Sequence, residues 1–190
     1  MDDIFTDREF VVCTADGASK TNYAVLSDML QRVRETFHMD VAFVSEFTEG
    51  HRVFRCVNSA PGENLVAEGC SSPLEESYCQ RIVDGRLPMA IPDAMALPAA
   101  RALPATEAAR VGAHLSVPIV LRNGEVFGTL CCFGHAAQPD LNAEDAELLR
   151  AVADLVAAGI DKKGLFRSTL WPTRAPSYLG ASSENPATRL

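Results

Sequence analysis

The chain has 190 residues and is 47% hydrophobic, which suits one domain with a single core and short extensions. Its formal net charge is -8 and it has no cluster of lysines and arginines, which argues against a surface that binds nucleic-acid phosphates. No stretch approaches the roughly 20 apolar residues of a membrane helix, and the acidic N-terminus lacks the apolar run of a signal peptide, so we expect a soluble cytoplasmic protein without nucleic-acid or membrane partners.

The N-terminal part of the chain divides into an arm and a helix. Residues 1–20 have mixed polarity and include a run of turn formers, which favours a flexible arm. From Thr21 to His38, apolar residues recur at gaps of three and four, the spacing of an amphipathic helix. The apolar stripe suits packing on a sheet of the same domain, and it also suits a seam with a helix of a second subunit.

Two β-rich segments follow this helix. They are Met39–Phe47 and His51–Asn58, and the short connection Thr48-Glu49-Gly50 between them predicts an antiparallel hairpin. Because side chains alternate along a strand, Phe54 and Cys56 are expected on one face of the second strand.

The next segment has the pattern of a helix start. Ser72 offers a capping hydroxyl, Pro73 suits the first helical position, and two glutamates follow near the positive end of the helix dipole. The helix is predicted to run to about Val83, because Asp84-Gly85 provides a stop.

A short strand and a group of helical pieces come next. Pro88–Asp93 predicts a strand at an edge of the sheet, because Pro92 cannot donate a ladder hydrogen bond. Residues 94–110 are rich in alanine but contain two prolines, so short helical pieces are expected rather than one long helix. Such a segment can cover a pocket, or it can simply connect two strands on the surface.

The stretch Gly112–Gly134 predicts the central hairpin of the sheet. Two apolar runs meet at Asn123-Gly124, a pair that favours a tight type I′ turn because both central residues of that turn need a positive φ. Alternation places Leu115 on one face of the first strand, with His114 and Ser116 on the other. Neither face is cleanly polar, so helices or loops are expected to cover both faces.

The last predicted element is a helix that begins after Asn142, its candidate cap, and ends near Gly164. Its predicted apolar stripe is Leu148, Leu149, Val152, Leu155 and Val156. Residues 165–190 are rich in proline, serine and alanine without a period, and they are predicted to be largely disordered.

The six cysteines do not have the spacing of a metal site. No Cys-x-x-Cys pair and no cysteine and histidine pair fits structural zinc. Cys131 and Cys132 point to opposite faces of one strand, so they are not placed to bridge each other. We expect no metal and interpret most of the thiols as small hydrophobic packing groups.

Four short stretches together resemble the GAF domain family. They are Ile91-Pro92-Asp93-Ala94, Leu115-Ser116-Val117-Pro118-Ile119, Gly124-Glu125-Val126-Phe127-Gly128-Thr129-Leu130 and Leu141-Asn142-Ala143-Glu144-Asp145. The resemblance covers residues 21–164, and Ser77–Leu87 is also similar to GAF modules beside cyclic-di-GMP-turnover domains in bacterial signalling proteins. It implies an α+β fold with a central antiparallel sheet of five to six strands, N- and C-terminal helices on one face and a ligand pocket on the other.

The resemblance also implies where the pocket would lie, between the sheet and residues 68–110. The candidate ligand-binding residues are Phe54, Cys56, Tyr78, Cys79, Asp93, His114 and Ser116. His114 suits a donor to a ligand carbonyl or a pH sensor, but an isolated strand histidine also suits a structural role. Cys79 suits a redox-sensitive or modified thiol, although packing explains an isolated cysteine as well.

The function that this resemblance implies is sensing. We expect a stand-alone bacterial GAF domain that binds a small molecule and signals in trans to a separate protein, without catalysis. The terminal helices would join two copies into a homodimer. A ligand would act by shifting a helix equilibrium, which requires different affinities for the two states. The sequence names neither the ligand nor a cofactor.

Three other functions stay open. Free methionine-R-sulfoxide reductases are GAF proteins, and Cys70 and Cys79 would be the pocket thiols here. Their nucleophile is expected between Cys79 and Cys131, where this chain has no cysteine. A tetrapyrrole-binding photoreceptor would need the usual Cys-His pair, but none of the six cysteines precedes a histidine. A degenerate GAF domain can also act as an interaction scaffold without a ligand.

Overall fold

The computed structural model describes residues 15–163, with side chains for residues 23–161. The helices are α1 (Ala15–Thr36), α2 (Tyr78–Val83), α3 (Pro98–Arg101), α4 (Pro104–Ala108) and α5 (Ala143–Lys163), and a 3-10 helix, η1 (Leu74–Glu76), precedes α2. The strands are β1 (Val41–Thr48), β2 (His51–Ser59), β3 (Ser71–Pro73), β4 (Ala90–Ile91), β5 (Ala113–Val120) and β6 (Val126–Gly134). The predicted boundary of the arm at residue 20 is wrong, because residues 15–20 belong to α1. Residues 1–14 of the predicted arm and all of the predicted tail lie outside the described residues.

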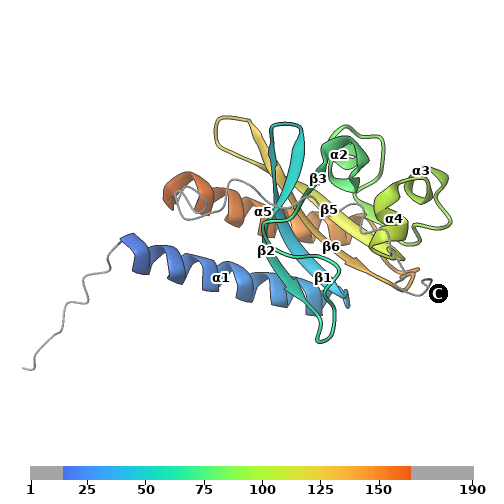
Figure 1. The fold of residues 1–190 in the computed structure, drawn as a ribbon, viewed down its shortest axis with the longest axis horizontal. Helices are drawn as coiled ribbons and strands as arrows, with labels where there is room; N and C mark the ends of the chain where they lie inside the picture. The colour runs from blue at the N-terminus through green and yellow to red at the C-terminus, as the bar shows by residue number, and fades with distance from the viewer. Residues whose placement is uncertain (1–14, 164–190) are drawn as a thin grey trace, which may run out of the picture.

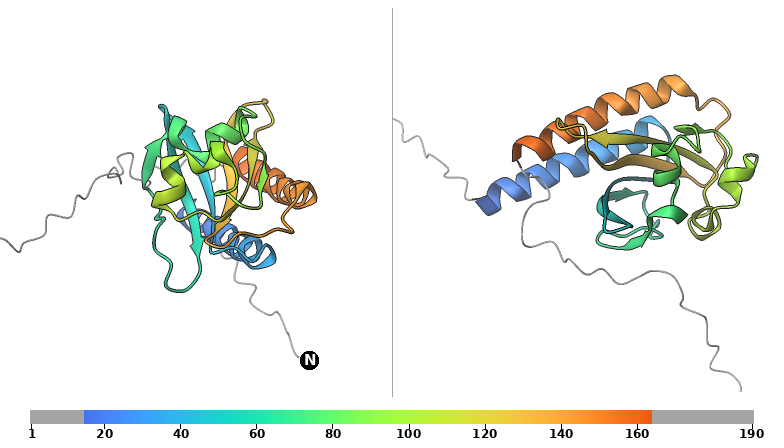
Figure 2. Two further views of the ribbon diagram at one scale, coloured as in Figure 1. Left: turned by 90° about the vertical axis from the view of Figure 1, so that its right-hand side faces the viewer. Right: turned by 90° about the horizontal axis from the view of Figure 1, so that it is seen from above.

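The six strands form one antiparallel sheet in the order β3-β2-β1-β6-β5-β4. Two long helices, α1 and α5, cover one face of this sheet, and the short helices α2, α3 and α4 lie over the other (Figure 1 and Figure 2). The α+β architecture expected from the sequence is therefore confirmed. No helix in the described part of the chain is long and apolar enough to cross a membrane.

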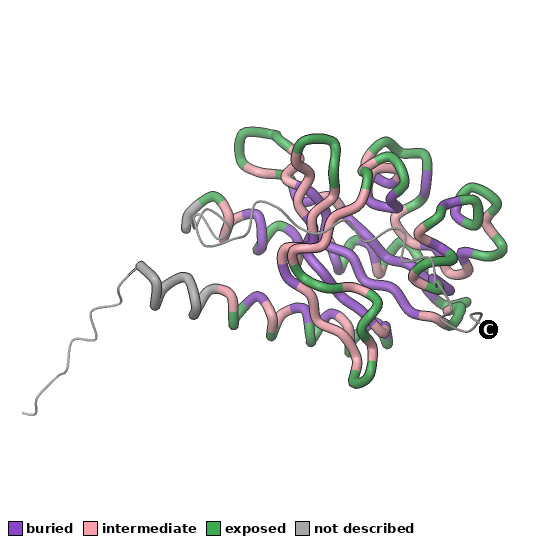
Figure 3. Tube along the Cα trace, viewed as in Figure 1, coloured by how far each residue is buried: buried purple, intermediate pink, exposed green. Residues whose placement is uncertain are grey.

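The sheet separates two hydrophobic cores, because alternate side chains of a strand point to opposite faces. The helix-side core, under α1 and α5, includes Leu30, Leu115, Leu130, Leu149 and Val156. The cavity-side core, under α2 to α4, includes Phe43, Tyr78, Ile82, Ile91 and Phe133. In Figure 3 the buried positions gather along the strands and on the inward sides of the helices.

The central hairpin is confirmed, but its turn is not type I′. The backbone N–H of Gly124 donates to the carbonyl of Leu121, and Gly124 alone of the central pair has a positive φ, at 84°. The Oδ1 atom of Asn123 accepts a hydrogen bond from the N–H of Glu125. This is a type I turn followed by a left-handed glycine, and the matching register shift lies between Ile119 and Val120.

The predicted helix start at Ser72 is wrong. Residues 71–73 form the edge strand β3, which pairs Arg52 with Ser72. The helix begins later, at Tyr78, where the Oγ atom of Ser77 accepts a hydrogen bond from the N–H of Gln80. Pairing with β2 satisfies backbone groups that an earlier helix start would leave at an open sheet edge. The cap of this helix is therefore Ser77, five residues after the predicted cap Ser72.

A bulge in β2 corrects the predicted faces of that strand. Val44 pairs with Cys56, but its neighbour Ser45 pairs with Phe54, so Arg55 is an extra residue. An extra residue shifts the alternation of side chains by one position. Phe54 therefore lies in the cavity-side core and Cys56 in the helix-side core, and the expectation that they share a face is wrong.

The stripe of α5 is only partly as predicted. The cap is confirmed, because the Oδ1 atom of Asn142 accepts from the N–H of Glu144. Leu149 and Val156 are buried, but Leu148 and Leu155 are 59% and 65% exposed. These two leucines are one residue away from the buried pair, which places them about 100° around the helix and outside its contact with the sheet.

The central position of Leu130 gives a stability prediction. Its side chain is fully buried between the sheet and the long helices. We expect Leu130→Ala to reduce the free energy of unfolding by about 2–5 kcal/mol, because the change removes buried methyl groups and leaves a cavity. Chemical denaturation measures it, and Val120→Ala, at a 44% exposed position of the same hairpin, is the control with little expected change. Equal effects of the two substitutions would contradict the assignment of the core.

Candidate functional site

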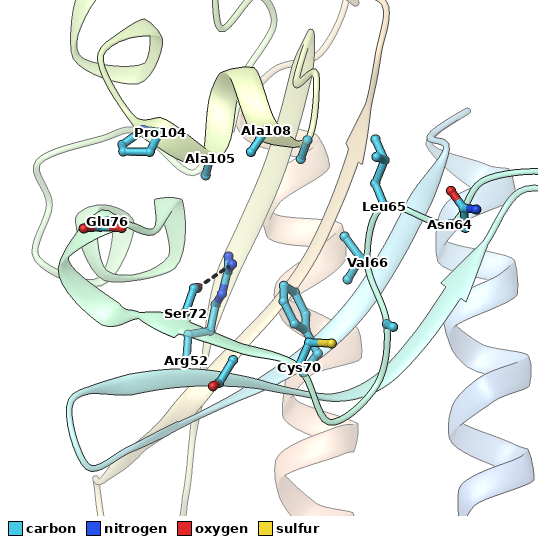
Figure 4. A pocket seen from close by; sticks show the side chains of 14 residues that line it. Arg52, Asn64, Leu65, Val66, Cys70, Ser72, Glu76, Pro104, Ala105 and Ala108 are labelled. Atoms are coloured by element: carbon cyan, nitrogen blue, oxygen red, sulfur yellow. Dashed lines mark hydrogen bonds between the residues drawn. The ribbon is translucent and has the colours of Figure 1, made fainter. Parts of the chain in front are cut away.

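A cavity of about 440 Å³ lies over the β2 and β3 side of the sheet. Its floor is formed by Arg52 and Phe54 of β2, one wall by residues 64–67, and its roof by α4 (Figure 4). The full set of lining residues is Arg52, Phe54, Asn64, Leu65, Val66, Ala67, Cys70, Ser71, Ser72, Glu76, Pro104, Ala105, Ala108 and Ala109. Most of these side chains are apolar, so the polar groups of the few others decide what can bind.

Arg52 is the cationic group of the cavity. Its Nη2 atom donates to the Oγ atom of Ser72 at 2.9 Å, and its guanidinium carbon lies 4.4 Å from the centre of the Phe54 ring. Its Nη1 atom lies 3.7 Å from the Sγ atom of Cys79. Its Nε atom is buried without a hydrogen-bond partner. In Figure 4 the guanidinium points from β2 toward α4, so it faces the space that a ligand would occupy.

The wall of the cavity is held to the rest of the protein at two points. Glu68 accepts hydrogen bonds from the N–H of Val57 in β2 and from the hydroxyl of Tyr23 in α1. Farther back along this segment, Glu63 contacts His135, just after β6, with 2.6 Å between the Oε2 and Nε2 atoms. The wall therefore connects the cavity both to the helix side and to the end of the central hairpin.

His135 is suited to carry a positive charge. Its Nε2 atom faces the Glu63 carboxylate, and its Nδ1 atom lies 2.9 Å from the carbonyl oxygen of Arg110. Both partners accept hydrogen bonds, so both ring nitrogens donate when the ring is protonated. Partial burial lowers the pKa of His135, but the hydrogen bonds to Glu63 and Arg110 outweigh it and raise the pKa above its ordinary value. The same hydrogen bond lowers the pKa of Glu63.

A buried polar cluster lies behind Arg52, under α2. The Sγ atoms of Cys79 and Cys131 are 3.7 Å apart. Cys131 contacts the Oγ atom of Ser116 at 2.9 Å, and its thiol donates to the Oγ1 atom of Thr129 at 3.1 Å. Thr129 also shares a 2.9 Å hydrogen bond with Ser45. Three strands and one helix thus bring two thiols and three hydroxyls together in the interior.

The two thiols of this cluster differ electrostatically. Burial alone raises the pKa of a thiol. For Cys79 this effect is outweighed by its hydrogen bond with Cys131 and by the positive charge of Arg52, so the pKa falls below its ordinary value. The pKa of Cys131 rises, because burial and the neighbouring Cys79 both disfavour a second negative charge. Cys79 is therefore the thiol of the pair that ionises first.

Tyr78 and His114 form a second buried contact. Their rings stack with centroids 4.4 Å apart, and the Tyr78 hydroxyl hydrogen-bonds to Thr106 of α4 at 2.5 Å. Burial and the charge of Arg52 lower the pKa of His114 to about 3, so its ring is neutral near pH 7. Its Nδ1 atom has no hydrogen-bond partner. The structure thus places His114 in a buried packing contact with Tyr78.

The structure places the seven predicted site residues in three locations. Phe54 lines the cavity. Tyr78, Cys79, His114 and Ser116 lie in the buried layer between α2 and the sheet. Cys56 lies on the opposite face, and the Asp93 carboxylate caps a turn by accepting from the N–H groups of Met95 and Ala96. Five of the seven residues therefore lie on the cavity side of the sheet, and one of these five, Phe54, lines the cavity.

Sequence reasoning missed most of the cavity lining. Arg52 was accessible to it, because Arg52 is two residues from Phe54 and precedes the bulge, so alternation places both on one face. The alanine-rich segment 94–110 was expected either to cover a pocket or to connect two strands, and α4 within it covers the cavity. Residues 64–67 have no pattern that marks them as a wall. Within the described residues, no group of three or more histidine, cysteine, aspartate or glutamate side chains is arranged to hold a metal ion.

Comparison with known proteins agrees with this architecture. The family model for the GAF domain matches residues 21–161. A far-red cyanobacteriochrome photoreceptor is similar with a TM-score of 0.62 and 17% identity, over 77% of this chain and 90% of that chain. The GAF domain region of a putative membrane protein from Geobacter sulfurreducens PCA is similar with a TM-score of 0.60 and 19% identity, over 78% of this chain and 99% of that chain. The type II free methionine-R-sulfoxide reductase from Thermoplasma acidophilum is similar with a TM-score of 0.56 and 16% identity, over 74% of this chain and 92% of that chain. No curated protein matched the sequence.

The contact between Glu63 and His135 predicts that the cavity wall loosens at alkaline pH. The raised pKa of His135 gives stability that is present below its unfolded pKa, about 6.5, and is lost as the pH rises through the folded value. The lowered pKa of Glu63 gives stability that is present above about pH 4.5 and lost in acid. Hydrogen exchange of residues 60–70, corrected for intrinsic rates, should therefore show more protection at pH 5.5 than at pH 8.5.

Glu63→Gln should remove most of this pH dependence, because it removes the charge that faces the imidazolium. Glu68→Gln is the matched control: it neutralises a carboxylate of the same segment that contacts Val57 and Tyr23 instead of His135. A pH dependence that survives in Glu63→Gln would show that another group controls the wall.

Proposed function

Because the chain belongs to the GAF domain family, we propose that it is a sensory module that binds a small organic acid in the cavity over β2 and β3 and signals to a separate protein without catalysing a reaction. The observation that carries this proposal is the position of Arg52. Among the described residues, its guanidinium contacts a hydroxyl and a thiol, and no carboxylate pairs with it.

A cation in this position favours an anionic ligand. A partly buried guanidinium loses hydration that one hydroxyl and one sulfur atom replace only in part, whereas a carboxylate offers a charge and two acceptors in matching geometry. The free Nε atom adds an unsatisfied donor on the same group. Glu76 also lines the cavity, but it is exposed at the rim, where water screens its charge. The volume and the apolar roof suit an acid with a hydrocarbon or aromatic body.

The signal is proposed to leave the cavity through its wall. Ala67 lines the cavity, and the next residue, Glu68, hydrogen-bonds to Tyr23 of α1. A ligand that draws residues 64–67 toward Arg52 would therefore move an anchor of α1. It would shift the helix only to the extent that it binds the two positions of the wall with different affinity.

The absence of catalysis is proposed from the positions of the thiols. A sulfoxide reductase needs a cysteine that can attack the bound substrate, and Cys70 is the thiol that lines this cavity. Cys79 and Cys131 are fully buried behind Arg52. The similarity to the Thermoplasma acidophilum reductase concerns the fold, at 16% identity. Cys70 is therefore the one described thiol in the lining, and no second described cysteine lies beside it in the cavity to resolve an oxidised intermediate, which supports binding over turnover.

We propose that the outer surface of α1 and α5 joins two copies of the protein. Val25 of α1 is 53% exposed, and Leu148 and Leu155 of α5 are exposed as well. The two leucines are seven residues apart, so they form one row along the helix. Both helices lie on the same face of the sheet (Figure 2), so this row can take part in a helical seam between subunits.

The ligand proposal is tested with pairs of small monocarboxylic acids and their primary amides, with free methionine sulfoxide added to the set. Thermal shift and native mass spectrometry should show tighter binding of acids than of amides, by roughly tenfold to a hundredfold, because a hydrogen bond to a charged group contributes about 1.5–3 kcal/mol. Arg52→Gln should abolish the difference. Arg101→Gln is the control, because it removes the same charge from an exposed site on α3.

Each contrary result has a separate meaning. Equal binding of acids and amides would contradict the role of Arg52 but not the cavity as a binding site. Binding of neither class would contradict the sensory function. Reduction of methionine sulfoxide with thiol reductants would overturn the proposed absence of catalysis.

The dimer is tested by analytical ultracentrifugation of the double substitution Leu148→Glu and Leu155→Glu. It should shift the protein from dimer to monomer, because two charges would be buried in an apolar seam. Met95→Glu is the matched control, since Met95 is 55% exposed but lies between β4 and α3, outside the two long helices. A wild-type protein that stays monomeric at high concentration would refute this interface.

A further inference from the structure

Cys79 and Cys131 come from distant parts of the chain and meet inside the protein. Cys79 lies on the short helix α2, and Cys131 lies on the central strand β6. Their Sγ atoms are 3.7 Å apart, which is van der Waals contact, and both side chains are fully buried. The sequence left Cys79 open as either a redox-sensitive thiol or a packing group and assigned Cys131 to packing, and it did not predict that they touch.

The surroundings of the pair are polar and asymmetric. Ser116 and Thr129 hydrogen-bond to Cys131, whereas the Nη1 atom of Arg52 lies against Cys79. A thiol that only fills a core does not need hydroxyl partners or a neighbouring cation. Burying hydroxyls and a cation costs free energy unless they are paired. The arrangement instead matches what thiol oxidation requires: one thiol stabilised as a thiolate, and a second thiol beside it.

We propose that Cys79 and Cys131 form a redox pair that a hydroperoxide, such as hydrogen peroxide, converts into a disulfide. This inference does not require the proposed organic-acid ligand to bind, although Arg52 contacts both the cavity and Cys79. It adds an oxidative modification site behind the cavity, with Cys79 as the attacking thiol and Cys131 as the resolving one.

The chemistry balances with the peroxide as the two-electron oxidant. The Cys79 thiolate attacks one peroxide oxygen, the O–O bond breaks, and the leaving hydroxide takes up a proton to become water. The product is a sulfenic acid on Cys79. The Cys131 sulfur then attacks the Cys79 sulfur, the S–O bond breaks, and the hydroxyl leaves as water with the proton of Cys131. The sum is two thiols and one peroxide giving one disulfide and two waters.

Arg52 is also the barrier between the pair and the cavity. Its side chain lines the cavity and contacts Cys79 at the same time. A rotation of this side chain would connect the cavity to the thiol, and a peroxide is small enough to use that path. The other described cysteines are placed differently: Cys56 and Cys132 lie in the helix-side core, and Cys70 lines the cavity.

Disulfide formation would change the cavity. The two sulfur atoms must close from 3.7 Å to about 2.05 Å, and the short helix α2 is freer to move than the central strand. Since η1 and β3 immediately precede α2, its movement would displace Glu76 and Ser72 in the lining. Oxidation would also convert the thiolate beside Arg52 into a neutral disulfide sulfur, so the guanidinium would be free to bind another anion.

The test is a disulfide map of the folded, full-length protein after mild treatment with hydrogen peroxide. Remaining thiols are alkylated under denaturing conditions, and mass spectrometry locates every bridge. The expected result is the loss of two hydrogen atoms and one cross-linked peptide that joins Cys79 to Cys131, reversed by dithiothreitol. Oxidation confined to Cys70, or bridges scattered over several cysteines, would overturn the proposal.

Substitutions sharpen the test. Cys79→Ser and Cys131→Ser should each abolish the bridge, whereas Cys132→Ser should leave it intact, although Cys132 is adjacent in sequence, because it faces the other side of the sheet. Arg52→Gln should slow bridge formation about tenfold near pH 7, and the pH at which the rate of bridge formation rises should move upward. Arg52→Lys should restore the wild-type rate and pH profile. An unchanged pH profile in Arg52→Gln would refute the role of Arg52. The disulfide map of the wild-type protein tests the Cys79–Cys131 bridge even if a variant fails to fold.

Discussion

The pairing of β1 with β6 is the contact on which the rest of the structure depends. It joins the hairpin of β1 and β2 to the hairpin of β5 and β6, and so makes one sheet from two local units. The two strands are so close at Gly128 that a Cβ atom there would lie 2.0 Å from the carbonyl oxygen of Ser45. The same pairing places Ser45 opposite Thr129, and so builds one edge of the buried polar cluster around Cys131.

This constraint explains how much of the fold the sequence predicted. Both hairpins, the two long helices and the edge strand at Ala90 follow from alternation, spacing and caps, which are local signals. The join between the hairpins is a contact between residues more than eighty positions apart, and single-sequence patterns do not encode such partners. The resemblance to a known family supplied that part of the architecture, and the residue pattern alone did not.

The candidate site was harder to predict than the fold, for reasons that particular residues show. The bulge at Arg55 changes the face of every later residue of β2, and nothing in the sequence marks it, so Cys56 was placed on the wrong side. Ser72 is a residue type that often caps helices, but here it lies in β3, because it pairs with Arg52 of the adjacent strand β2. Cys79 and Cys131 each look like packing residues until the sheet and α2 bring them into contact.

Arg52 connects the two proposals, because one guanidinium faces both an organic acid in the cavity and the thiol behind it. A positive charge stabilises a nearby thiolate, and a carboxylate bound to the same guanidinium competes for that stabilisation. A bound acid would then raise the pKa of Cys79 and protect it from peroxide. By linkage, the thiolate must weaken binding of the acid by the same factor, and conversion of the pair to a neutral disulfide would remove this competition. The cavity and the thiol pair are therefore expected to act as one coupled site, in which Arg52 transmits the state of each to the other.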